Sequence, residues 1–176
     1  VLRLGLSWYD GFVGIVMHAG EVVARRRFED EHGIVHEYDE ELAGEAMEGG
    51  PLMLAWNAIA ASNDPAEFGR DEVYNVVIHE FAHVIDMRDG VADGVPPLGS
   101  KERQHWIDII DAEWERFCAR VDAGEDTLID PYGAEAVEEF FAVAVEAFFV
   151  APAAMRSEEP AMYELLAGFL QQNPAG

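Results

Sequence analysis

The sequence predicts a single α+β domain, with a strand-rich first part at residues 1–60 and a mostly helical part at residues 64–176. Two observations support this class. Short apolar runs with strand character lie among glycine-rich loops in the first third. Beyond residue 64, apolar residues recur every three to four positions, which is typical of helices. The chain has 176 residues and 50% hydrophobic content, enough for one core.

The strand predictions fall at residues 2–6, 14–23 and 52–56. The last is a short apolar run bounded by glycines and a proline, which indicates where it begins. Between these segments, three consecutive arginines at 25–27 predict an exposed basic edge.

Helix-start signals mark the second part. Asp64 before Pro65 and Asp71 before an apolar helix at 76–85 are predicted caps. Ser100, at the end of the Gly/Pro-rich loop 89–100, is the predicted cap of the next helix. Helices near 152–155 and 159–171 close the domain. One face of the helix after Ser100 carries Trp106, Ile109, Ile110, Trp114, Phe117 and Val121.

The segment His79-Glu80-Phe81-Ala82-His83 has the H-E-x-x-H pattern. On a helix, residues four apart lie on the same face, so both imidazoles can bind one metal ion. Glu80 can then reach a water at an open position of Zn²⁺. Two solvated surface histidines are the alternative, but the flanking residues are too apolar for a solvated helix. Buried polar groups need partners, and a zinc ion supplies one for all three.

A third protein ligand is expected, and the spacing leaves three candidates. Asp89 lies where one known arrangement has a ligand, but Asp86 replaces the glycine needed for that turn. Asp86 is close to His83 on the same helix and is better suited to support a ligand than to be one. Glu139 lies on a later helix, whose stripe of Val137, Phe141, Ala144 and Phe148 faces a core.

Taken together, these motifs resemble the Mlc titration factor A (MtfA) family of zinc metallopeptidases. The resemblance rests first on the H-E-x-x-H segment with Asp86 and, about fifty residues later, on Tyr132, Glu139, Phe141, Ala142, Val143, Glu146, Phe148 and Phe149. Upstream matches are Trp8, Tyr9, Gly11, Phe12, Gly50, Pro51, Leu54 and Trp56. The catalytic domain of anthrax lethal factor is similar across the same two helices.

The resemblance implies a zincin-like fold, one Zn²⁺ held by His79, His83 and Glu139, and peptide hydrolysis with an aminopeptidase-like preference. Glu80 is then the general base. Tyr132 would stabilise the transition state, which suits a phenol at the mouth of the Glu139 helix.

The lethal-factor pattern has an acid four residues after the ligand glutamate, where this chain has Val143. A ligand histidine passes its other ring N–H to a carboxylate or carbonyl. Asp86, Glu146 or a backbone carbonyl would take this role here.

Zincin folds also imply a strand running along the cleft, to which substrate adds as an extra strand. The segment containing Leu54 and Trp56 is the expected strand, and these two residues are the predicted substrate contacts. The family name implies a second function, in which the domain binds a transcriptional repressor and zinc is structural or regulatory.

The net charge of −24 opposes binding to nucleic acids and anionic membranes. No apolar run approaches a membrane span, and the start does not resemble a signal peptide. The single cysteine, Cys118, excludes an internal disulfide and favours a reducing cytoplasm. The acidity indicates either a solvated surface or attraction of cationic substrates or a basic partner.

Overall fold

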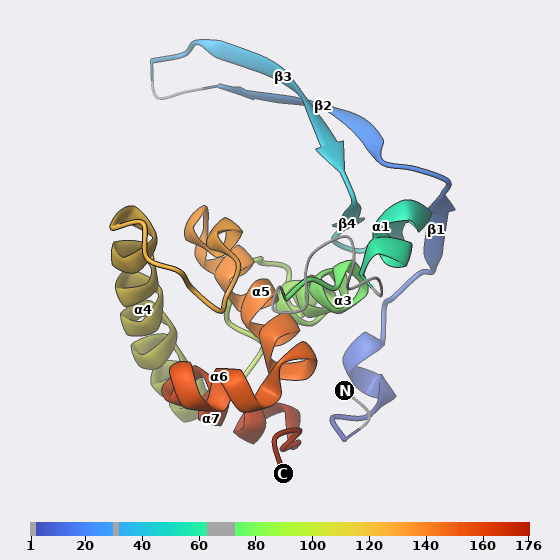
Figure 1. The fold of residues 1–176 in the computed structure, drawn as a ribbon. Helices are drawn as coiled ribbons and strands as arrows, with labels where there is room; N and C mark the ends of the chain where they lie inside the picture. The colour runs from blue at the N-terminus through green and yellow to red at the C-terminus, as the bar shows by residue number, and fades with distance from the viewer. Residues whose placement is uncertain (1–2, 30–31, 63–72) are drawn as a thin grey trace.

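A computed structural model describes residues 3–29, 32–62 and 73–176. It confirms the predicted α+β class: strands gather in the N-terminal part and helices form the rest. Helix α3 (Val76–Asp86) lies between the small sheet and helix α5 (Val137–Val150), as Figure 1 shows. The helix that carries the H-E-x-x-H segment is therefore held between both halves of the fold.

A three-stranded sheet has the order β1-β5-β4. Strand β1 (Ile15–His18) runs parallel to β5 (Leu52–Ala55), and β4 (Gly44–Ala46) runs antiparallel to β5. All four β5 residues are buried, because this strand has a neighbour on each side and is covered by helices. The expectation that this strand offers an edge is therefore wrong, and β4 is the edge on the side of α3.

Strands β2 (Val22–Glu29) and β3 (Val35–Leu42) form a separate antiparallel hairpin that projects from the body of the molecule (Figure 1). The predicted basic edge at residues 25–27 lies on β2. Arg25 and Arg27 are exposed there, as predicted, whereas Arg26 is partly buried, and all three form ion pairs with acids of β3.

The helical part is built around α5. Its neighbours include α3 on one side and the long helix α4 (Ser100–Asp122) on the other (Figure 1). The remaining elements are η1 (Leu6–Tyr9), α1 (Trp56–Ala61), η2 (Met87–Asp89), η3 (Pro131–Ala134), α6 (Pro152–Glu158) and α7 (Pro160–Leu170). Nine of the fourteen α5 residues are buried, so this helix forms the centre of the core. Within the described ranges, no helix has the length and apolarity needed to cross a membrane.

Some boundary predictions are wrong. The described part of residues 2–6 is a turn that leads into η1, because Gly5 has a left-handed φ of 87° that interrupts extended backbone. Ser100 is the first helical residue of α4, and Gly99 occupies the cap position. The predicted caps Asp64 and Asp71 lie outside the described residues.

Candidate metal centre

Helix α3 presents the two histidines from one face. Its N-cap is Asn75, whose side-chain oxygen accepts a hydrogen bond from the Ile78 N–H at 3.0 Å. The cap, four residues before His79, fixes where the helix begins. His79 and His83 are one turn apart, and their Nε2 atoms lie 3.1 Å from each other.

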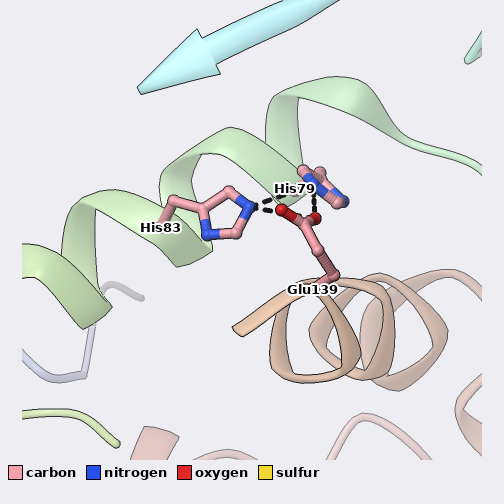
Figure 2. Close-up of side chains that lie close together, drawn as sticks. All are labelled: His79, His83 and Glu139. Carbon is pink, nitrogen blue, oxygen red and sulfur yellow. Dashed lines mark hydrogen bonds and ion pairs between the residues drawn. The ribbon is translucent and has the colours of Figure 1, made fainter. Parts of the chain in front are cut away.

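Helix α5 brings Glu139 to the same point. Its Oε2 lies 3.2 Å from His79 Nε2 and 3.4 Å from His83 Nε2, and Figure 2 shows all three side chains converging. Burial acts to raise the pKa of Glu139, but the two imidazoles outweigh it and lower that pKa to about 2. Glu139 is therefore an anion at neutral pH and can serve as a ligand.

The three atoms fit a zinc ion. A tetrahedral centre with ligand bonds of about 2.0 Å places its ligand atoms about 3.3 Å apart. The observed separations of 3.1, 3.2 and 3.4 Å lie around this value. Glu139 Oε2 is buried and makes no further hydrogen bond within the described residues. The donor set of two imidazoles and one carboxylate also suits zinc.

Glu146 supports His79 from behind. It lies two turns after Glu139 on α5 and is buried. Its Oε1 is 2.8 Å from His79 Nδ1, and its Oε2 accepts a hydrogen bond from the Asn75 N–H. With the proton on Nδ1, a neutral His79 would offer the lone pair of Nε2 to a metal ion bound beside Glu139. Of the three supporting groups left open by the sequence, the structure places Glu146 against His79.

Asp86 has a different position. It is fully buried at the end of α3, and its Oδ2 accepts a hydrogen bond from the Gly94 N–H at 2.9 Å. The Gly94 carbonyl in turn accepts from Trp106 Nε1 at 2.8 Å. Asp86 therefore holds the loop after η2 against α3 and α4. Asp89 is exposed on η2 and is not part of the metal-ligand cluster.

Glu80 is buried beside the edge strand. Its side chain is in such close contact with β4 that a Cβ on Gly44 would lie 2.5 Å from Glu80 Oε1. A hydrogen bond from the backbone of Ala46 also reaches this carboxyl group. Burial raises the pKa of Glu80, which strengthens it as a proton acceptor.

Tyr132 lies across the cluster on η3. Its N–H donates to Asp130 Oδ1 at 2.8 Å, and its ring centroid is 6.1 Å from that of His79. Gly133 brings this turn onto α5, since a Cβ there would lie 2.8 Å from Val143. Burial and then the charge of Glu139 raise the pKa of Tyr132, so its hydroxyl remains a hydrogen-bond donor.

Two cavities of about 270 Å³ each meet at the cluster. Both are lined by His79, Glu80 and Tyr132. Glu40 also lines both. One cavity further contains His83, Glu139, Arg26, Glu45 and Glu138, and the other contains Tyr74, Val76, Asp130, Val143 and Glu146. A larger apolar cavity of about 650 Å³ lies on the opposite face of α3, but its lining contains none of the cluster residues.

The predicted substrate contacts Leu54 and Trp56 do not line either cavity at the cluster. Leu54 is buried in the central strand, and Trp56 is exposed at the start of α1. Sequence reasoning missed the positions of β4, Gly44, Asn75 and Arg26 at the site. Asn75 gives a capping signal directly before the apolar helix, but no sequence signal places Gly44 beside Glu80 or Arg26 in the cavity lining.

The fold and the cluster define a zincin-like α+β protein with a His-His-Glu cluster that could hold a metal ion. Residues 1–171 match the model of the glucose-regulated metallopeptidase M90 family, and the chain belongs to this family. Its relatives include Mlc titration factor A of Edwardsiella ictaluri, 36% identical over 99% of this chain and 66% of the relative. Mlc titration factor A of Yersinia pestis is 32% identical over 99% of this chain and 63% of the relative. The chain thus spans about two thirds of the length of these curated relatives.

Proposed function

We propose that the protein is a zinc-dependent peptidase of the glutamate type, with His79, His83 and Glu139 as ligands. The observation that carries this proposal is the convergence of these three side chains within 3.4 Å, beside a buried Glu80. Membership in a metallopeptidase family agrees with it. Zinc bound there would lower the pKa of a water molecule and polarise a substrate carbonyl.

The protein's own residues supply the proton transfers. Glu80 accepts the proton of the attacking water and then delivers it to the leaving amine. Its burial excludes bulk water and favours the neutral, proton-carrying form between these two steps. Tyr132 donates its O–H to the developing oxyanion. Glu146 keeps the His79 ring oriented while charge develops.

An extended peptide is proposed to bind along β4. This strand is the sheet edge beside Glu80, and it can pair with a peptide through its backbone groups. An aminopeptidase-like preference is supported by the lining of one cavity, in which Glu40, Glu45 and Glu138 outnumber the single arginine, Arg26, that pairs with the first two. A positively charged peptide amino group suits that lining.

Hydrolysis of a panel of short peptides by zinc-loaded protein tests the proposal. Activity should disappear in Glu80→Gln and under chelation, while Glu80→Gln retains one zinc per chain. Activity in Glu80→Gln equal to that of the parent protein would contradict the assigned role of Glu80. Faster cleavage of peptides with a free amino terminus than of acetylated ones would support the aminopeptidase preference.

A regulatory function is the second proposal, supported by the name of the relatives, Mlc titration factor A. The net charge of −24 suits a basic surface on such a partner. Binding of the repressor Mlc to Glu80→Gln, measured by calorimetry, separates this function from hydrolysis. Loss of binding in that variant would show that the two functions are not separate. The single free cysteine supports a reducing, cytoplasmic location as part of this proposal.

A further inference from the structure

The β2–β3 hairpin projects from the body of the molecule (Figure 1). Part of it nevertheless lines a cavity at the His-His-Glu cluster. Arg26 of β2 and Glu40 and Leu42 of β3 line the cavity that also contains His79 and His83. Arg26 is four residues beyond the start of β2, about 13 Å along a strand. The hairpin therefore borders the cleft over several residues and not only at its base.

Arg26 links the hairpin to the edge strand of the sheet. Its Nε donates to Glu40 Oε2 at 2.6 Å, within the hairpin, and its Nη2 donates to Glu45 Oε1 at 2.8 Å, on β4. Strand β4 is the element that contacts Glu80 through Gly44. The guanidinium thus connects the hairpin to the strand that borders the reacting groups.

The neighbouring arginines do not make this link. Arg25 pairs with Asp39 at 3.6 Å and Arg27 with Glu37 at 4.0 Å, both inside the hairpin. Their side chains are 76% and 69% exposed, against 37% for Arg26. Side chains alternate between the faces of a strand, so Arg25 and Arg27 point away from the face that carries Arg26.

We propose that the β2–β3 hairpin is one wall of the peptide-binding cleft and that Arg26 is the positioning residue that holds it there. This inference rests on the proposed peptidase function and extends it to the part of a peptide beyond the bond that is cut. The ligand is an extended peptide backbone. A guanidinium has five N–H donors, and two are used by Glu40 and Glu45, so the others can donate to peptide carbonyls.

The test compares Arg26→Gln with Arg25→Gln, which removes the same charge from the same strand on the opposite face. Both changes are made in zinc-loaded Glu80→Gln, so that peptides bind without being cut. Fluorescence anisotropy measures binding of a neutral decapeptide labelled at its C-terminus. An unlabelled dipeptide serves as a competitor that is too short to reach the hairpin.

Arg26→Gln should raise the Kd of the decapeptide about tenfold and leave the inhibition constant of the dipeptide unchanged. Arg25→Gln should change neither constant. Adding Glu45→Gln to Arg26→Gln should not raise the Kd of the decapeptide further, because Arg26→Gln has already removed the ion pair between these two residues. Equal decapeptide affinity in Arg26→Gln and Arg25→Gln would overturn the proposed role of the hairpin and leave the peptidase proposal intact. Peptide binding by none of the proteins would overturn the peptidase function together with this inference.

Discussion

At the scale of single residues, the carboxylates around His79 favour its protonated form. Burial opposes charge on His79, but hydrogen bonds to Glu139 and Glu146 outweigh it and raise its pKa to about 10. Protonated His79 interacts through Nε2 with Glu139 Oε2. This ion pair occupies the two atoms that would otherwise bind a metal ion. The metal must therefore displace a proton at neutral pH.

Zinc binding at pH 7 should release about one proton per ion, because His79 is charged below its pKa of about 10 and must be neutral to bind zinc. The apparent affinity should then rise with pH between 7 and 10. Calorimetric titration in buffers of different ionisation enthalpy measures the number of protons released. The variant Glu139→Gln lacks the carboxylate nearest to His79 Nε2, so it should release fewer protons for each zinc ion that it binds. Zinc binding with no proton release would contradict this account.

At the scale of elements, the site depends on how closely β4 approaches α3. Gly44→Ala would place a methyl group 2.5 Å from Glu80 Oε1 and force the carboxylate out of its present position. Displacement of a catalytic group by about 1 Å lowers the rate on the order of a hundredfold. We therefore expect kcat/KM to fall by about that factor while zinc content, measured by atomic absorption, stays at one per chain.

Gly20→Ala is the matched control for this change, since a Cβ at Gly20 meets no atom within 4 Å. Its activity should equal that of the parent protein. Full activity in Gly44→Ala would show that Glu80 does not act from the position observed here.

The contact of buried Asp86 with the loop between η2 and α4 should make the stability of the protein depend on pH. Burial raises the pKa of Asp86 to about 7, from 3.8. The folded state therefore favours protonated Asp86, and this stabilisation is complete below pH of about 4 and lost as pH rises through 7. Asn mimics the protonated form. The free energy of unfolding of Asp86→Asn, relative to the parent protein, should rise between pH 5 and 8 by at most about 3 kcal/mol.

Urea unfolding of chelator-treated protein at several pH values measures this difference without a contribution from metal. Asp89→Asn is the control, because Asp89 is exposed three residues further on. A difference between Asp86→Asn and the parent protein that stays constant across this range would contradict ionisation of Asp86 as its cause.

At the scale of the whole molecule, the helical core could be predicted from sequence because its signals are local. The apolar spacing on α4 and α5 depends only on residues within each helix. The order of strands depends on pairing between distant segments, so β5 was predicted as an edge although β1 and β4 flank it. In the site, spacing was enough to bring His79 and His83 to one face. The approach of Gly44 to Glu80 required the folded chain, because the two lie on different elements.

Loss of zinc should lower the stability of the whole domain, because the proposed ligands join α3 to α5, the two central helices of the fold. A ligand present at a thousand times its Kd stabilises the folded state by about 4 kcal/mol. In a chain of this size that corresponds to a Tm change of roughly 10 °C. Scanning calorimetry with zinc and with chelator measures the shift, and a His79→Ala/His83→Ala variant should show none. If chelation leaves the Tm of the parent protein unchanged, the two helices are held together by apolar packing alone, and the cluster contributes to chemistry without contributing to the fold.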